Sequence, residues 1–280
     1  MQAVIITCYK DKKQLFNLIN CFSKNTNFYI HIDKKSNLID IEDFKNMENV
    51  YVIKKYNIGW GSLNHVYAII DLLKEAIKNK NNKYYHILSG QDYMIKSASE
   101  FDAFFENNNN IYMCYMTHDE MPKETINRYK KGCFNSVLPA NKKVINIFNK
   151  SCGLIRNKKG IGDFNEVYKG LIWSSMPNDV VKYILNYINE NKKYMKDLKH
   201  CVIPEEFFFQ TIILNSKFKN HVVNDDLRYN DWHFVNGSDP AYLDESYFEK
   251  INLTNDLFIQ KVDSNISKKL IEMYKKGNGE

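Results

Sequence analysis

The alternation of short apolar runs with amphipathic stretches is the feature that most limits how this chain can fold. Runs of four to seven mostly apolar residues predict buried strands, and stretches with apolar residues three and four apart predict helices. Such alternation implies right-handed crossovers and a mostly parallel sheet flanked by helices. We therefore predict an α/β fold. Strands are expected at residues 3–8, 28–33, 50–53, 84–88 and 111–116, and helices at 15–22, 64–79 and 97–105.

The predicted strand at 84–88 is followed by an unusual set of polar residues. Ser89, Gly90, Gln91 and Asp92 bring together a hydroxyl, a backbone without a side chain, an amide and a carboxylate. In an open α/β sheet, ligands bind at the carboxyl ends of the strands. These residues are either part of a ligand site or an ordinary polar turn after a strand.

The second half of the chain is less regular. Periodicity is weak from 117 to 170, where we expect loops and short helices. A strand is expected at 171–176, and Pro177 is expected at the first position of a helix. Another helix should begin at Pro204 and reach Leu214, and further strands are expected at 227–229 and 257–261. We predict one domain at 1–264 and a C-terminal helix or tail at 265–280, which either packs on the domain or lies on a membrane surface.

Composition and charge exclude several classes of protein. The net charge of +6 suits an anionic ligand or surface, but no basic stripe interleaved with aromatics indicates nucleic acid. The six cysteines include no Cys-x-x-Cys pair, which argues against a zinc site or a disulfide framework. There is no signal peptide and no membrane-spanning apolar run. We expect a cytoplasmic protein, with peripheral contact at the inner membrane surface kept open.

Familiar catalytic motifs are missing. The chain has no Gly-x-Gly-x-x-Gly, no phosphate-binding P-loop, no Gly-x-Ser-x-Gly and no His-Glu-x-x-His. It also lacks Asp-x-Asp, the triplet with which many sheet-based sugar transferases hold a metal ion on a nucleotide diphosphate. A sugar transferase of this kind would need other cations at the diphosphate.

Two cations and two carboxylates late in the chain could supply such chemistry. Arg228 and Lys261 lie at or next to predicted strand ends, although either alone could be an ordinary surface cation among 39. Glu205 and Glu206 begin a predicted helix, where acidic residues commonly complement the helix dipole. The same position keeps a carboxylate ionised, as a general base requires. Neighbouring helical residues point about 100° apart, so only one of the two can face a cleft.

Four segments, in order, resemble the core-2/I-branching β-1,6-N-acetylglucosaminyltransferase family, which includes the peptide xylosyltransferases. The most specific is Leu-Ser-Gly-Gln-Asp-Tyr-Met-Ile-Lys-Ser at 88–97, in which Met94 replaces the family's proline. The others are His-Ile-Asp-Lys-Lys-Ser at 31–36, Trp-Gly-Ser with Asn-His-Val-Tyr-Ala at 60–68, and Pro-Glu-Glu-Phe-Phe-Phe-Gln-Thr at 204–211.

This resemblance implies a GT-A-like fold and a metal-independent, inverting transfer from a UDP-sugar to an acceptor hydroxyl. The family's catalytic base falls on Glu206, and its two diphosphate-binding cations fall on Arg228 and Lys261. Nucleotide contacts are expected from Cys8, Asp33 and Asp92. Contacts with the acceptor or donor sugar are expected from Arg128, Gln91, Trp173 and Glu205. No metal ion or other cofactor is expected.

The resemblance also implies partners and a setting. A bacterial-type enzyme that builds a surface glycan would take a UDP-sugar, with GlcNAc, xylose or a hexose as the sugar, and a glycan or lipid-linked glycan as acceptor. Two alternatives stay open: a metal-dependent or retaining sugar transferase on a similar fold, and a glycan-binding module without turnover.

Overall fold

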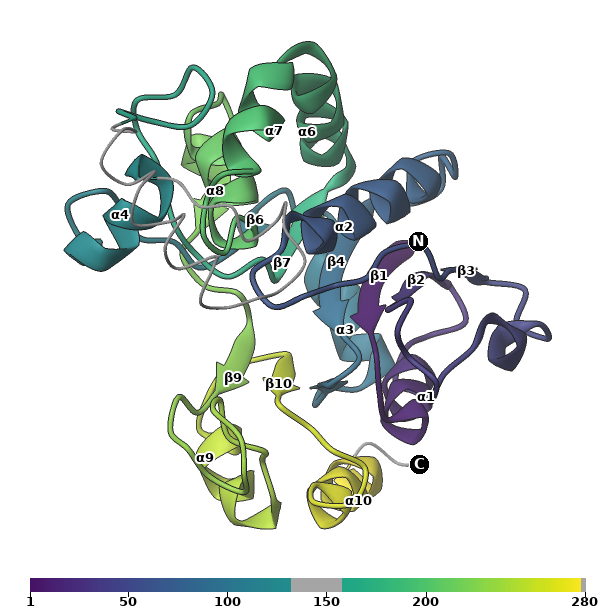
Figure 1. The fold of residues 1–280 in the computed structure, drawn as a ribbon. Helices are drawn as coiled ribbons and strands as arrows, with labels where there is room; N and C mark the ends of the chain where they lie inside the picture. The colour runs from purple at the N-terminus through teal and green to yellow at the C-terminus, as the bar shows by residue number, and fades with distance from the viewer. Residues whose placement is uncertain (132–157, 278–280) are drawn as a thin grey trace.

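The structure, a computed structural model, describes residues 1–131 and 158–277. Within them, seven strands form a main sheet in the order β3-β2-β1-β4-β7-β6-β8, and three strands form a small sheet in the order β5-β10-β9 (Figure 1). The strands are β1 (Gln2–Cys8), β2 (Thr26–Ile32), β3 (Val50–Ile53), β4 (Tyr84–Ser89), β5 (Asp92–Met94), β6 (Ile111–Tyr112), β7 (Ser174–Pro177), β8 (Val222–Val223), β9 (Arg228–Asn230) and β10 (Phe258–Gln260).

Helices connect these strands. The α-helices are α1 (Lys12–Asn20), α2 (Leu63–Ala76), α3 (Ala98–Phe105), α4 (Lys123–Lys130), α6 (Asn178–Glu190), α7 (Lys192–Leu198), α8 (Glu205–Leu214), α9 (Phe248–Asn252) and α10 (Lys268–Gly277). Short 3-10 helices are η1 (Ile41–Phe44), η2 (Lys219–His221) and η3 (Glu245–Tyr247).

The centre of the main sheet is parallel, as the alternation predicts. β1 pairs in parallel with β2 on one side and with β4 on the other. β7 is antiparallel to both β4 and β6, so the sheet is mixed only beyond β4. The α/β prediction of a mostly parallel sheet flanked by helices is therefore confirmed. From β1 the chain continues to β2 and β3 on one side of the sheet, and β4 then lies on the other side of β1. Because the strand order reverses there, a crevice is expected where β1 and β4 end.

Both faces of the main sheet are buried. Successive residues of a strand point to opposite faces, and β1 follows this rule: Ala3 and Ile5 pack with α2, α6 and α8, whereas Val4 and Ile6 pack with α1 and α3. The start of α3 also follows its sequence, since Ser97 and Glu100 form the predicted capping box. This two-sided burial explains why the central strands are nearly continuous apolar runs.

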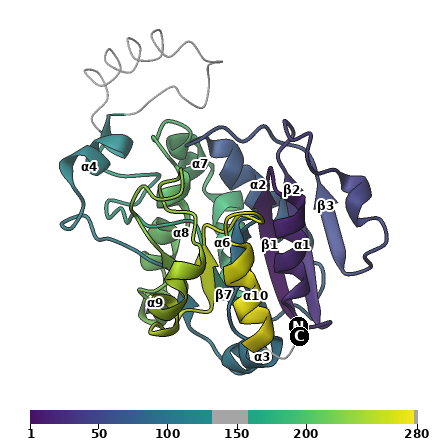
Figure 2. The ribbon, with the colours of Figure 1, turned by 90° about the horizontal axis from the view of Figure 1, so that it is seen from below.

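The small sheet carries its own apolar cluster. Tyr93 and Ile259 pack there with Ile251 of α9 and with Leu270 and Ile271 of α10. Figures 1 and 2 place α9 and α10 on the side of the main sheet towards which β1 points. The C-terminal amphipathic helix therefore buries its apolar face against the rest of the chain.

Several boundaries differ from the sequence prediction. The strand expected at 111–116 is limited to β6. The strand expected at 171–176 begins later and ends one residue later, as β7 at Ser174–Pro177. The residues before β7 bond to α8 instead of a neighbouring strand: Gly170 N–H donates to the Glu206 carbonyl at 2.8 Å, and the Gln210 side chain donates to the Leu171 carbonyl at 2.6 Å. Pro177 ends β7 and precedes α6. Of the region 117–170, residues 132–157, with Cys133 and Cys152, lie outside the described residues.

The close approach of β1 and β4 at their carboxyl ends gives a first prediction. A Cβ at Gly90 would lie 2.7 Å from the Cys8 Cβ, closer than carbon atoms pack, so Gly90→Ala forces the two strand ends apart. We expect a loss of roughly 1–3 kcal/mol in the free energy of unfolding, measured by denaturant titration. Gly59→Ala is the matched control, because its nearest atom is 3.9 Å away. Equal stability of the two variants would contradict this close packing.

Candidate active site

Asp92 organises the turn that follows β4. Its carboxylate accepts a hydrogen bond from Ser89 N–H at 2.7 Å, and its carbonyl accepts one from the Gln14 side chain at 2.8 Å. The Ser89 hydroxyl in turn accepts from Gln91 N–H at 3.2 Å. Burial raises the pKa of Asp92 to about 6, opposed by the charge of Arg228. The polar residues after β4 are thus part of a built turn at the end of the sheet.

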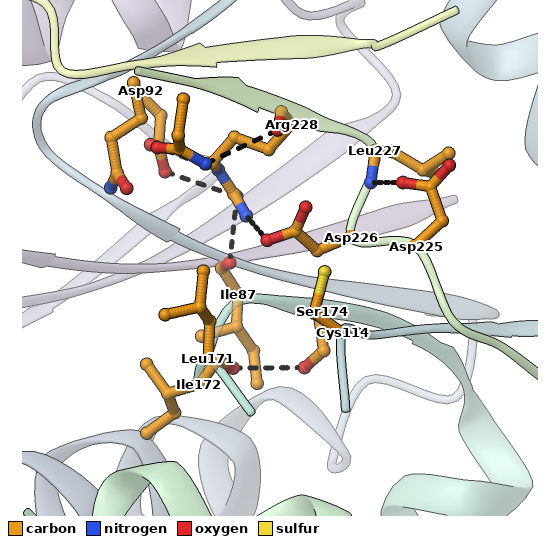
Figure 3. Close-up of polar contacts among 12 residues, drawn as sticks. Ile87, Asp92, Cys114, Leu171, Ile172, Ser174, Asp225, Asp226, Leu227 and Arg228 are labelled. Carbon is orange, nitrogen blue, oxygen red and sulfur yellow. Dashed lines mark hydrogen bonds and ion pairs between the residues drawn. The ribbon is translucent and has the colours of Figure 1, made fainter. Parts of the chain in front are cut away.

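Arg228 lies buried against this turn (Figure 3). Its Nε is 3.3 Å from the Asp92 carboxylate and its Nη1 is 3.6 Å from the Asp226 carboxylate, while Nη2 donates to the Ile87 carbonyl at 3.5 Å. Only 1% of the side chain is exposed. The interpretation of Arg228 as an ordinary surface cation is therefore wrong.

The ring of Trp173 lies near both Arg228 and His65. Its ring lies 5.6 Å from the Arg228 guanidinium carbon and 5.9 Å from the His65 ring. His65 comes from the first turn of α2, and its Nε2 is 3.0 Å from the hydroxyl of Thr7, close to the end of β1. The indole thus lies between the buried arginine and the start of α8, where Glu205 faces His65.

Glu205 occupies an apolar, mostly buried position. Its carboxylate is 4.0 Å from His65 Nδ1, and its second oxygen is buried without a hydrogen-bond partner. Burial raises the pKa of Glu205 to about 7, and the charge of Glu206 adds to the shift. Burial lowers the pKa of His65 to about 4. At neutral pH His65 is therefore uncharged, so its contact with Glu205 is not an ion pair.

Glu206 points to different neighbours. Arg128 Nη1 donates to its carboxylate at 2.8 Å, and Lys169 Nζ lies 3.5 Å from the same oxygen. The next three residues, Phe207 to Phe209, are fully buried. The two adjacent carboxylates therefore differ in kind: one is desolvated beside a neutral histidine, and the other is compensated by two cations at the surface of the site.

Lys261 and Gln91 meet at the other side of the strand ends. Val262 N–H donates to the Gln91 carbonyl at 2.8 Å, which holds the end of β10 against the turn after β4. The Gln91 side chain donates to the Tyr242 hydroxyl at 3.3 Å, and Lys261 Nζ donates to Ser238 Oγ at 3.2 Å. Burial lowers the pKa of Lys261, and the charge of Lys10 contributes.

Cys8 and Asp33 lie at the ends of β1 and β2. The Cys8 thiol is buried and donates to the His31 carbonyl at 3.7 Å; burial, with the Asp33 charge, raises its pKa to about 12. Asp33 accepts from the backbone N–H groups of Lys35 and Ile58 at 2.8 and 3.1 Å. In this structure Cys8 bonds to β2 and Asp33 orders the loops that follow β2 and β3, and their nucleotide contacts stay a prediction.

The structure adds four residues that the site prediction does not include. His65 lies within the segment 60–68 that carries the resemblance, so the sequence held a signal for it. Lys169 is one cation among many in a region without periodicity, and nothing in the sequence marks it. Lys10 follows β1 and Tyr242 precedes α9, and only the folded chain brings the two residues together.

Two further findings concern the described residues alone. In them, no group of three or more histidine, cysteine, aspartate or glutamate side chains is arranged to hold a metal ion. None of their helices combines the length and apolar character needed to cross a membrane. Metal independence itself stays a prediction.

Comparison with known proteins identifies the family of this chain. A family model for the core-2/I-branching enzymes matches residues 3–258. The chain is 21% identical over 225 residues to xylosyltransferase sqv-6 from Caenorhabditis briggsae and 20% identical over 229 residues to xylosyltransferase sqv-6 from Caenorhabditis elegans. Each match covers 77% of this chain but only 26% of the relative, so the chain spans about a quarter of their length.

Among solved structures, an apo structure of the bifunctional glycosyltransferase WbbM is similar in part. It matches 99% of this chain and 50% of its own, with a TM-score of 0.40 and 13% sequence identity.

The buried state of Glu205 predicts a pH-dependent stability. Its folded pKa of about 7 lies above the ordinary 4.5, so the folded protein keeps a proton that the unfolded chain releases between these values. Stability from this carboxyl therefore falls as the pH rises from about 4.5 to 7. We expect Glu205→Gln to raise the free energy of unfolding by roughly 1–3 kcal/mol at pH 8 and to change it little at pH 4.

Thermal unfolding at a series of pH values measures this effect. The control is Glu190→Gln, which replaces an exposed carboxylate at the end of α6. A Glu205→Gln variant that is no more stable than wild type at pH 8 would show that the carboxyl is ionised at little cost.

Proposed function

This chain belongs to the core-2/I-branching enzyme family, and from that premise we propose that it transfers a sugar from a UDP-sugar to a hydroxyl group of an acceptor. The observation that carries the proposal is the position of Glu206. It lies at the start of α8 beside two cations, and the neighbouring Glu205 lies near His65, which contacts Thr7 of β1. GlcNAc, xylose or a hexose is the proposed sugar, and a glycan or lipid-linked glycan is the proposed acceptor.

The proposed reaction is a single displacement with inversion. Glu206 removes the proton of the acceptor hydroxyl, whose oxygen attacks the anomeric carbon from the face opposite UDP. The bond between the anomeric carbon and the diphosphate oxygen breaks, and its electrons pass to UDP. Lys261 and Arg228 stabilise that negative charge, the kind of electrostatic term that usually contributes most to catalysis. We propose that no metal ion takes part.

The neighbours of Glu206 are compatible with its role as a base. An ionised carboxylate offers about four lone-pair sites, so the contacts with Arg128 and Lys169 leave room for an acceptor hydroxyl. We propose that Arg128, which contacts Glu206, also contacts the acceptor. We propose further that Glu205 and Trp173, which both lie near His65, contact a sugar ring.

We also propose a setting for this activity. The net charge of +6 and the resemblance to bacterial-type members support the synthesis of a bacterial surface glycan in the cytoplasm, with the protein near the inner membrane surface.

Replacing Glu206 tests the proposed function. Glu206→Gln keeps the shape of the side chain but cannot take a proton, so we expect transfer to slow by about 10²–10⁴-fold while UDP binding stays near the wild-type value. Product formation from a UDP-sugar and calorimetric titration with UDP measure the two effects. Glu190→Gln serves as the control. Turnover close to wild type in Glu206→Gln would assign the base to another residue.

Removal of divalent ions tests the second part of the mechanism. We expect the rate of transfer to be unchanged after dialysis against EDTA, because side-chain cations carry the charge at the diphosphate. The rate with and without chelator measures this, and the anomeric configuration of the product, read by NMR, distinguishes inversion from retention. A loss of activity that Mg²⁺ or Mn²⁺ restores would favour the metal-dependent alternative.

A further inference from the structure

We propose that Lys10, held by Tyr242, is a third diphosphate-binding cation, which acts together with Lys261 and Arg228. The proposal rests on the proposed UDP-sugar activity and adds residues to its nucleotide site. Lys10 has no part in the resemblance described above.

Lys10 lies where three strand ends converge. It is the second residue after β1, Gln91 is the second after β4, and Lys261 directly follows β10. Gly90 N–H donates to the Thr7 carbonyl at 2.9 Å, and the Gln260 side chain donates to Ser89 Oγ at 2.9 Å, so the three ends are bonded to one another. An open α/β sheet binds its ligand at such strand ends.

Tyr242 holds Lys10 in this crevice. Lys10 Nζ donates to the Tyr242 hydroxyl oxygen at 2.5 Å and also lies 5.1 Å from the centre of that ring. The Gln91 side chain donates to the same oxygen. Both contacts use the oxygen as an acceptor, so the Tyr242 hydroxyl orients the Lys10 ammonium group. An ammonium group has three donors, and Lys10 uses one of them on Tyr242, so Lys10 has donors left for an anion.

The charges around the two lysines are not balanced by carboxylates. Within the part of the chain that the structure describes, neither Lys10 nor Lys261 has a carboxylate within 4.0 Å. Burial has the largest effect on the pKa of Lys261 and lowers it; Tyr242 opposes this shift, the charge of Lys10 adds to it, and Asp239 opposes it more weakly. Two ammonium groups that repel each other at the end of a sheet are stabilised by an anion between them.

Arg228 differs in this respect. Its guanidinium already contacts Asp92 and Asp226 and is almost completely buried. Among these three cations, the positive charge without a carboxylate partner therefore belongs to Lys10 and Lys261. Together they carry two positive charges, as a divalent ion does, and they are placed to bind the diphosphate before transfer and to stabilise the added charge when UDP leaves.

Calorimetric titration with UDP and with uridine tests the proposal. In Lys10→Met we expect UDP to bind about tenfold to a hundredfold more weakly, because a charge-assisted hydrogen bond is lost, and uridine to bind as in wild type. Lys10→Arg, which keeps the charge, should recover most of the affinity. The matched control is Lys13→Met, which removes an exposed lysine from the same region.

A double-mutant cycle tests the role of Tyr242. Tyr242→Phe should weaken UDP binding in the wild-type background and have little further effect in Lys10→Met, because the hydroxyl acts through Lys10. Fully additive effects would overturn this part of the proposal.

The other outcomes separate this inference from the proposed function. If wild type binds UDP and Lys10→Met binds it equally well, the inference fails and the proposed function stands. If Lys10→Met loses UDP and uridine affinity alike, Lys10 shapes the site without contacting phosphate, and the inference also fails. If wild type binds no UDP, the proposed donor is wrong, and the role of Lys10 is rejected with it.

Discussion

The ion pair between buried Arg228 and Asp92 is the interaction on which the arrangement of this protein depends. A guanidinium with 1% exposure is tolerated only when carboxylates compensate its charge. Asp92 begins β5, Asp226 precedes β9, and the Ile87 carbonyl belongs to β4, so this one side chain ties the small sheet to the main sheet (Figure 3). Loss of either partner would leave a buried charge without compensation.

This buried pair separates the cations of the site into two kinds. Arg228 has carboxylate partners and a fixed position, whereas Lys10 and Lys261 have polar partners that leave donors free. In the proposed mechanism, Lys10, which follows β1, joins the side-chain cations at the diphosphate. A position after the first strand is well suited to this, because that strand lies next to β4 at the centre of the sheet.

The two glutamates at the start of α8 show how a helix terminus can create two chemical environments. Adjacent residues on a helix point in different directions, so Glu205 faces His65 and the core while Glu206 faces Arg128 and Lys169. One carboxyl is kept partly protonated near neutral pH by burial, and the other is kept next to positive charge. Environments that differ in this way are how one site holds an acid and a base together.

The sequence by itself determined the elements with strong local signals. The central strands, the capping box at Ser97 and the start of α8 follow from periodicity and capping chemistry, and they appear in the structure close to the predicted residues. The segments at 88–97 and 204–211 also pointed to Asp92 and Glu206, because their residue types are specific in combination.

Tertiary structure alone decided the rest. The strand expected at 171–176 became shorter because its first residues bond to α8, which periodicity cannot show. The burial of Arg228, the approach of Lys169 to Glu206 and the contact between Lys10 and Tyr242 join residues that are 37 to 232 positions apart. Such contacts depend on how strand ends converge in space, and a lysine carries no local mark of the partner it will meet.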